Sequence, residues 1–181
     1  MSGPDDTGGP DTVPARPVPV AVALGANLGD RAATLRSALR RLQTEAGLTD
    51  VRVSAMYETP PVGGPEQGPY LNAVLVARCG LSPRQLLHAG LRVEAEHGRD
   101  RSVRWGPRTL DVDVLVHGGT VCADPELTLP HPRARDRGFV LVPWAEVDPD
   151  AELPGPDGGR VADLVRTAAD APHARRTDLG W

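Results

Sequence analysis

The feature that most constrains the fold of this chain is the order in which apolar runs of strand length alternate with longer segments of helical periodicity. Apolar residues that run or alternate over roughly four to eight positions predict a strand, and apolar residues that recur every three or four positions predict a helix. The predicted order, strand, helix, strand, strand, helix, strand, is the βαββαβ pattern of ferredoxin-like α+β folds, with a mainly antiparallel sheet and helices packed on it. In sequence order the segments are Val18–Leu24, a helix from Asp30 to Gly47, Val51–Tyr57, Tyr70–Arg78, a helix from Ser82 to His97, and Leu110–Val116.

The two ends of the chain differ in composition from the part between them. Residues 1–16 are rich in Gly, Pro and Asp and show no apolar periodicity, so we expect a disordered leader there. Residues 17–170 carry all the predicted elements, including short helices over 135–147 and 161–169, and a length of 181 residues fits one domain. Residues 171–181 are expected to follow as a C-terminal tail.

Cysteine usage and hydropathy limit the class of protein further. Cys79 and Cys122 stand far apart without a Cys-x-x-Cys motif, which indicates neither a disulfide framework nor a zinc site. No apolar run is long enough for a transmembrane helix, and no signal-peptide pattern is apparent. We therefore expect a cytoplasmic protein, monomeric, that makes no membrane contact.

The basic residues exclude several chemistries. All 20 of them are Arg, and the absence of Lys excludes a Walker-type P-loop and a Schiff-base enzyme. The net charge of −4 argues against a protein that coats nucleic acid. If this chain handles phosphates, it must use Arg side chains, metal ions and backbone amides.

Two aspartates on the last predicted strand are the strongest candidates for chemistry. Asp111 and Asp113 are two positions apart, so their side chains share one face of the strand, while Leu110, Val112, Val114 and Val116 are expected to face the core. Two neighbouring carboxylates repel each other and need a cation between them, and Mg²⁺ is the hard cation that such oxygens suit. The alternative is a solvated strand face that carries two unrelated acids.

An arginine-rich segment precedes this strand. Arg99, Arg101, Arg104 and Arg108 lie within ten residues, and Trp105 stands among them before a Gly-Pro pair. Arginine forks bind phosphate oxygens, so a cationic loop beside an acidic pair is an arrangement that can hold a polyphosphate with its metal ions. The alternative is a solvated basic loop.

Two further clusters indicate a ligand site. His131 stands between two prolines in an extended loop, where its ring could reach a phosphate or a metal-bound water or, alternatively, cap a turn. Tyr70 and Asn72 share one face of a strand, an arrangement that suits a flat heterocycle or, alternatively, a cross-strand pair of a hairpin. The segment Gly25–Gly29 lacks the spacing of a dinucleotide-binding loop and is interpreted as a turn into the first helix.

Together these motifs resemble those of the 6-hydroxymethyl-7,8-dihydropterin pyrophosphokinase family. The resemblance runs from about residue 18 to about residue 168, and the segment from Arg104 to Asp113 (RWGPRTLDVD) is its most specific part. The other motifs, in the family's order, are GANLGD at 25–30, YETPP at 57–61, YLN at 70–72, LPHP at 129–132 and RGF at 137–139.

The resemblance implies an enzyme of the folate pathway that moves the terminal two phosphates of ATP, as one unit, to the hydroxymethyl oxygen of the pterin and releases AMP. By the family pattern, two Mg²⁺ ions would be held by Asp111 and Asp113, which with Arg99 and Arg108 form the expected catalytic set. The residues that the family pattern assigns to ATP are Glu94, Arg99, Arg101, Arg108, Thr128, His131 and Arg137. Those that it assigns to the pterin are Thr59, Pro60, Val62, Tyr70, Asn72, Trp105 and Phe139.

The chain departs from the family pattern at two positions, and two other classes of function stay open. Leu91 and Glu126 stand where other residues are expected, which puts an adenine contact in doubt. A metal-dependent nucleotidyl transferase would share the fold and the aspartate pair, but it should add a third carboxylate and a basic track, which are not apparent. An inactive nucleotide-binding module should have lost the aspartates or the arginines, and both are present.

Overall fold

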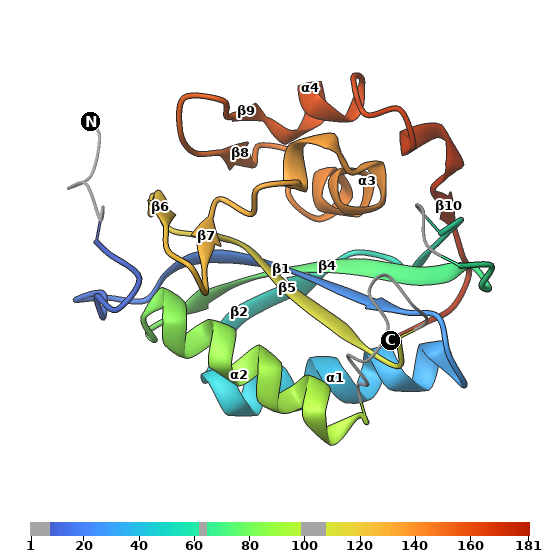
Figure 1. The fold of residues 1–181 in the computed structure, drawn as a ribbon, viewed down its shortest axis with the longest axis horizontal. Coiled ribbons are helices and arrows are strands. Elements are labelled where there is room, and N and C mark those ends of the chain that lie inside the picture. Colours follow the sequence, from blue (N-terminus) through green and yellow to red (C-terminus); the bar gives the residue numbers. More distant parts are fainter. Residues whose placement is uncertain (1–7, 62–64, 99–107) are drawn as a thin grey trace.

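The computed structural model describes residues 8–61, 65–98 and 108–181. An antiparallel sheet whose strands differ in length forms its centre. Its strands lie in the order β10, β3, β4, β1, β5, with β2 paired to β4, and every pairing is antiparallel (Figure 1). These strands are β1 (Val18–Ala26), β2 (Thr49–Val53), β3 (Tyr57–Thr59), β4 (Tyr70–Cys79), β5 (Asp111–His117) and β10 (Arg175–Arg176).

The predicted ferredoxin-like α+β topology is confirmed. The first strand lies between β4 and β5, and the helices α1 (Arg31–Ala46) and α2 (Pro83–Glu96) cover one face of the sheet (Figure 1). The predicted strand over 51–57 is in fact two strands, β2 and β3. Ser54 lies at the break, where its backbone N–H donates to the Val74 carbonyl and its Oγ accepts from the Val74 N–H, so a side chain takes over the pairing with β4.

Both helices on this face begin and end at the residues that the sequence indicated. Asp30 caps α1 by accepting from the Ala33 N–H at 2.9 Å, and Gly47 ends the helix in the left-handed conformation that glycine favours. Ser82 and Gln85 form a reciprocal capping box at the start of α2, with Pro83 in the first turn.

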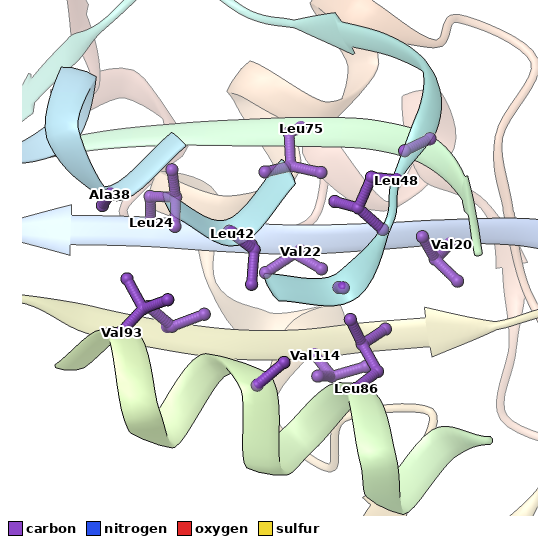
Figure 2. Packing of buried hydrophobic residues seen from close by; sticks show 14 of the residues in the cluster. Val20, Val22, Leu24, Ala38, Leu42, Leu48, Leu75, Leu86, Val93 and Val114 are labelled. Atoms are coloured by element: carbon purple, nitrogen blue, oxygen red, sulfur yellow. The ribbon is translucent and has the colours of Figure 1, made fainter. Parts of the chain in front are cut away.

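The main core lies between the sheet and these two helices. Leu24 from β1, Leu42 from α1, Leu75 from β4 and Leu86 from α2 are all at most 1% exposed and pack together (Figure 2). Close packing on this face fixes the strands in place, and with them the side chains on the opposite face of the sheet.

The opposite face of the sheet is covered by the second half of the chain (Figure 1). The helix α3 (Gly138–Val147), with its buried Trp144, and the short helix α4 (Val161–Val165) pack there against a second apolar cluster. The hairpin of β6 (Cys122–Ala123) with β7 (Thr128–Leu129) and the 3₁₀ turn η1 (Ala134–Asp136) precede α3 in the chain. The hairpin of β8 (Glu152–Leu153) with β9 (Gly159–Arg160) connects α3 to α4, and the 3₁₀ turn η2 (Ala171–His173) follows α4.

One prediction about strand faces is wrong. Val116 was expected beside Val112 and Val114, but it packs in the second cluster, on the other face. Ala21 pairs with Val116 and Val22 with Val114, so Leu115 is an extra residue in the ladder. A bulge of this kind reverses the alternation of faces beyond it.

The C-terminal half also differs from the prediction in its boundaries. The helix expected over 135–147 starts only at Gly138, because Arg137 is extended (φ −107°, ψ 102°) and separates η1 from α3. The helix expected over 161–169 ends at Val165. Residues 171–181, expected as a tail, supply the edge strand β10, and the Trp181 indole N–H donates to the Ser54 carbonyl at 2.7 Å.

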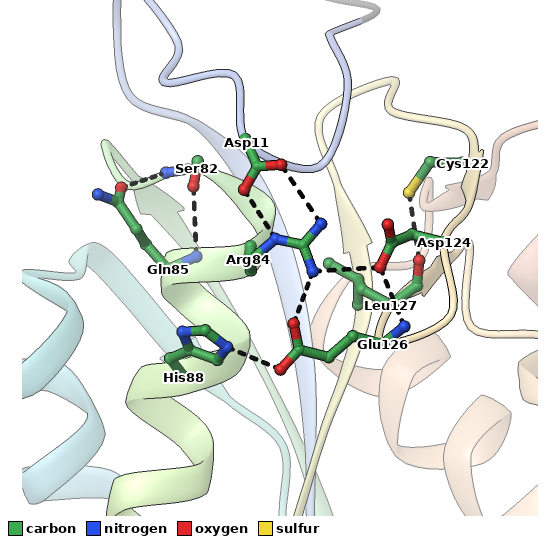
Figure 3. Close-up of polar contacts among 9 residues, drawn as sticks. All are labelled: Asp11, Ser82, Arg84, Gln85, His88, Cys122, Asp124, Glu126 and Leu127. Atoms are coloured by element: carbon green, nitrogen blue, oxygen red, sulfur yellow. Dashed lines mark hydrogen bonds and ion pairs between the residues drawn. The ribbon is translucent and has the colours of Figure 1, made fainter.

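Arg84 on α2 binds the N-terminal segment through an ion pair with Asp11. The described part of the expected leader, residues 8–16, meets α2 through Asp11, whose carboxylate binds the Arg84 guanidinium, and the same guanidinium binds Asp124 and Glu126 (Figure 3). His88 also binds Glu126, at 2.9 Å. Within the described residues, no helix is long and apolar enough to cross a membrane.

Replacing a core leucine is expected to lower stability strongly. Leu75→Ala removes buried methyl groups from the main core and should lower the free energy of unfolding by about 3 kcal/mol. Leu179→Ala, at a 44% exposed position, is the matched control and should change it little. Urea unfolding of both variants measures the difference, and equal costs would contradict the assignment of the core.

Replacing Arg84 is expected to remove an acid-sensitive contribution to stability. The hydrogen bond from Arg84 holds the pKa of Asp124 below its usual range, and hydrogen bonds from His88 and Arg84 do the same for Glu126. A carboxyl group whose pKa is lower in the folded state than in the unfolded state stabilises the folded state at pH values above the unfolded-state pKa. This stabilisation is lost as the pH falls through the folded-state pKa. The wild type should therefore exceed Arg84→Met in unfolding free energy at neutral pH, and the difference should shrink below about pH 4.

The matched control for this prediction is Arg40→Met, at an exposed position of α1. Urea unfolding across the pH range should give no pH-dependent difference between that control and the wild type. A difference for Arg84→Met that is constant down to the acid limit would show that the ion pairs do not cause it.

Candidate active site

A cleft of about 660 Å³ opens on the α3 side of the sheet. It lies where β1, β3, β4 and β5 meet the chain around the start of α3, so the strands form its floor. The residues that line it are Ala23, Leu24, Gly25, Thr59, Pro60, Gln67, Tyr70, Asn72, Arg108, Asp111, Asp113, Arg133, Asp136, Arg137, Phe139, Ala169 and Asp170.

The two predicted aspartates both line this cleft. Asp111 lies opposite Gly25 and Asp113 opposite Ala23 in the ladder with β1, so small neighbours leave space above the carboxylates. Val112, between them, is 4% exposed and faces the main core. The strand alternation thus directs both carboxylates to one face, as predicted.

Cationic side chains compensate the two carboxylates. Arg108 Nη1 lies 2.7 Å from Asp111 Oδ2, and Arg137 Nη1 lies 3.6 Å from Asp113 Oδ2. His131 Nε2 lies 3.8 Å from the same Asp113 oxygen. Arg108 and Arg137 thus place a positive charge beside each carboxylate, and the expected Mg²⁺ between the two aspartates stays a prediction.

Burial sets the charge state of the two cationic candidates beside Asp113. Burial, and then the nearby Arg137 charge, lower the pKa of His131 to about 4, so its imidazole is neutral at physiological pH. Burial also lowers the pKa of Arg137, but a guanidinium stays protonated in proteins. The positive charge at this carboxylate therefore comes from Arg137, whose guanidinium also lies 5.3 Å from the centroid of the Phe139 ring.

Aromatic and amide side chains form another part of the lining. Asn72 Nδ2 donates to Thr59 Oγ1 at 2.6 Å across the β3–β4 pair, and both residues are less than 10% exposed. Tyr70 lines the cleft from the same strand and Phe139 lines it from α3. These are flat and hydrogen-bonding groups of the kind that bind a heterocycle.

The predicted turn at 25–29 has a role that the sequence did not reveal. Asn27 Oδ1 accepts from the Arg108 N–H at 2.7 Å, and the Asn27 N–H donates to the Arg108 carbonyl at 3.1 Å. The Asn27 amide also donates to Gln67 Oε1 at 2.8 Å. The turn therefore fixes the backbone of Arg108 and the side chain of Gln67 at the rim of the site.

Several lining residues were not predicted. Arg133 and Asp136 lie between the motifs at 129–132 and 137–139, so their charge beside these motifs is the signal that could have found them. Gln67 and Asp170 stand outside the motifs, and each makes a hydrogen bond at the site to a residue distant in sequence, which no local pattern indicates.

Some predicted residues lie elsewhere or outside the described part of the chain. Glu94 is 2% exposed, and its Oε1 accepts from the Val112 N–H at 2.8 Å, beneath the aspartate pair. Thr128 pairs with Ala123 in the β6–β7 hairpin. Their ATP-binding roles stay predictions. The remaining expected ligands, Val62, Arg99, Arg101 and Trp105, fall outside the described residues.

The donor set fits Mg²⁺ in the way that this ion binds with substrate phosphates. Within the residues that the structure describes, no group of three or more His, Cys, Asp and Glu side chains is placed to hold a metal ion. Magnesium commonly takes one or two carboxylates and completes its coordination with water and phosphate oxygens. Asp111 and Asp113 supply those two carboxylates at the surface of the cleft.

Comparison with known proteins identifies the family. The model of the 7,8-dihydro-6-hydroxymethylpterin-pyrophosphokinase family matches residues 21–149. This chain belongs to that family. The pyrophosphokinase of Methylorubrum extorquens is 45% identical over 134 residues, which cover 74% of this chain and 85% of the relative. The Haemophilus influenzae enzyme is 38% identical over 149 residues, which cover 82% and 92%.

Solved structures agree on the fold. A Plasmodium falciparum HPPK-DHPS crystal structure with pterin and p-hydroxybenzoate matches with a TM-score of 0.68 at 12% identity, over 89% of this chain and 46% of that one. A second, with pteroate, gives a TM-score of 0.65 over 84% of this chain and 43% of that one. The chain thus spans less than half the length of these structures. Pyrophosphokinases of this family transfer a pyrophosphoryl group from ATP to hydroxymethyldihydropterin in folate biosynthesis.

A methyl group on Gly25 is expected to impair pterin use. A Cβ there would lie 2.7 Å from Asn72 Oδ1, so Gly25→Ala must move the Asn72 amide. The kcat/KM for the pterin should fall roughly tenfold or more, since small misplacements of binding groups have large kinetic effects. Steady-state kinetics test this. Gly119→Ala, where a Cβ meets open space, is the matched control; equal kinetics for both variants would contradict the prediction.

Proposed function

We propose that this chain transfers pyrophosphate from ATP to the hydroxymethyl group of 6-hydroxymethyl-7,8-dihydropterin in the cleft described above, and releases AMP. The observation that carries this proposal is that one cleft holds both parts of the required site. The aspartate pair lies there with Arg108 and Arg137, and Tyr70, Asn72 and Phe139 line the same cavity.

The charged part is assigned to the triphosphate. We propose that Asp111 and Asp113 hold two Mg²⁺ ions, which when bound neutralise phosphate oxygens and act as Lewis acids. Arg108 and Arg137 now pair with these carboxylates. Once the carboxylates have other cationic partners, the same guanidinium groups are free to bind phosphate oxygens, for which their forked geometry is suited.

The flat part is assigned to the pterin. The Asn72 amide offers both a donor and an acceptor to the polar edge of the ring, and Thr59 Oγ1 holds that amide in place. Tyr70 and Phe139 supply the aromatic surfaces against which the ring packs. The pterin hydroxyl oxygen attacks the β-phosphorus of ATP, the bond from that phosphorus to the α-phosphate oxygen breaks, AMP leaves with that oxygen, and the hydroxyl proton passes to solvent. The protein therefore has to position the substrates and neutralise charge rather than supply a nucleophile.

His131 is assigned a neutral role. His131 Nδ1 accepts from the Arg133 N–H at 3.2 Å, so this nitrogen carries no proton and the ring is neutral. The ring can position a phosphate oxygen or a water by hydrogen bonding but adds no positive charge. Arg137, at 3.6 Å from Asp113, supplies the charge at that place.

The cytoplasmic location and the monomeric state stay predictions, as do the roles expected for Glu94, Arg99, Arg101, Trp105 and Thr128. The alternative functions differ in their products: a nucleotidyl transferase would release pyrophosphate, and an inactive module would release nothing.

The proposal is tested by product analysis of the purified protein. Incubated with ATP, Mg²⁺ and 6-hydroxymethyl-7,8-dihydropterin, the protein should form AMP and pterin diphosphate in equal amounts. Release of ADP or of free pyrophosphate instead, or no reaction, would overturn it.

Removing either carboxylate is expected to abolish turnover. Asp111→Asn and Asp113→Asn each delete a charge that the metal ions need, which should lower kcat by about a thousandfold or more. Val112 and Val114 keep the strand in the core, so both variants should stay folded. Asp150→Asn, at an exposed position outside the set of residues that line the cleft, is the control. Folded Asp111 or Asp113 variants with near wild-type rates would rule out this site.

A further inference from the structure

The first turn of α3 carries two side chains of the site but lacks a cap of its own. Arg137 occupies the N-cap position and makes no capping hydrogen bond with its side chain. Its guanidinium instead reaches Asp113 at 3.6 Å and the Phe139 ring at 5.3 Å. A usual cap residue (Ser, Thr, Asp or Asn) could not make these two contacts. Its side chain is shorter than that of Arg, and it carries either no charge or a negative one.

The missing cap comes from a distant part of the chain. The Gly138 N–H donates to Asp170 Oδ1 at 2.6 Å, across 32 positions of sequence. Asp170 itself lines the cleft, beside Phe139 and Arg137. Its carboxylate therefore satisfies a free N–H at the start of the helix and lies where a negative charge is favoured.

The two segments are also in backbone contact. A Cβ on Gly138 would lie 2.8 Å from the Asp170 carbonyl carbon and would overlap the Ala171 backbone nitrogen. On either side of Asp170, Ala168 is buried in the second cluster and Ala171 packs against it, and the His173 N–H donates to the Asp170 carbonyl at 3.0 Å. Asp170 is thus held firmly enough to position the turn that it caps.

We infer that Asp170 is a positioning residue for the site, acting through Gly138 to hold Phe139 at the pterin end and Arg137 at the phosphate end. The inference rests on the proposed function for its substrate. It extends the site to a residue beyond the segment 21–149 that the family model matches. The same C-terminal segment continues into β10, which pairs with β3 and so also supports the Thr59 wall of the cleft.

Three variants test the inference. Asp170→Ala removes the cap and should weaken binding of 6-hydroxymethyl-7,8-dihydropterin about tenfold, the size that a lost cap gives. Asp170→Asn keeps an acceptor oxygen and should bind within about twofold of wild type, since Asn caps as well as Asp. Asp163→Ala, at an exposed position of α4, is the matched control and should bind as the wild type does.

A second measurement separates positioning from direct contact with the pterin. In the ligand-free protein, amide hydrogen exchange at Gly138 should be faster in Asp170→Ala than in wild type and unchanged in Asp170→Asn. Wild-type pterin binding by Asp170→Ala would overturn the inference. So would equal weakening by Ala and Asn, or weakened binding with unchanged exchange at Gly138.

If Asp170→Ala does not fold, Asp170→Leu replaces it. This side chain resembles Asp in shape and fills its place but offers no acceptor to the Gly138 N–H, so pterin binding should weaken, and wild-type binding would overturn the inference. The proposed function fails separately, through absence of AMP formation by the wild type, and the exchange rate at Gly138 then still decides whether Asp170 holds the helix.

Discussion

The repulsion between Asp111 and Asp113 is the constraint around which this site is organised. Strand alternation puts the two carboxylates on one face of β5, and the protein compensates them with Arg108 at 2.7 Å and Arg137 at 3.6 Å. A different set of hydrogen bonds positions each arginine. Asn27 holds the backbone of Arg108 through hydrogen bonds in both directions, and the capped start of α3 holds Arg137.

This arrangement suits a site that binds a positively charged metal ion together with a negatively charged triphosphate. In the absence of a metal, the arginines stabilise the carboxylates, and with a metal–triphosphate complex the carboxylates and arginines can each bind a partner of opposite sign. In either state, each of these two carboxylates and two arginines then has a partner of opposite sign. The neutral His131 fits this balance, because a third cation beside Asp113 would compete with the metal for the same oxygen.

Much of the fold and the chemical centre could be predicted from local patterns. Asp30, Gly47 and the Ser82–Gln85 box mark helix ends through contacts within a few residues, and the alternation at 110–114 sets the aspartates apart from the core. The family resemblance then assigned substrates to clusters whose chemistry alone left alternatives open. That assignment of family is confirmed by the match over residues 21–149.

What sequence reasoning missed depends on contacts between distant segments. The bulge at Leu115 shows no local signal, because it arises from the register with β1 and moves Val116 to the other face. The edge strand β10 is only two residues long and depends on β3 to form. Asp170 and Gln67 reach the cleft through hydrogen bonds across 32 and 40 positions of sequence, which no periodicity reveals.

A crystal structure of the protein with a non-hydrolysable ATP analogue, Mg²⁺ and the pterin tests these assignments in one measurement. We expect metal density bound by both Asp111 and Asp113, phosphate oxygens on Arg108 and Arg137, and the pterin ring against Phe139 with its polar edge on Asn72. Metal bound away from these aspartates, or a pterin ring outside this cleft, would contradict it.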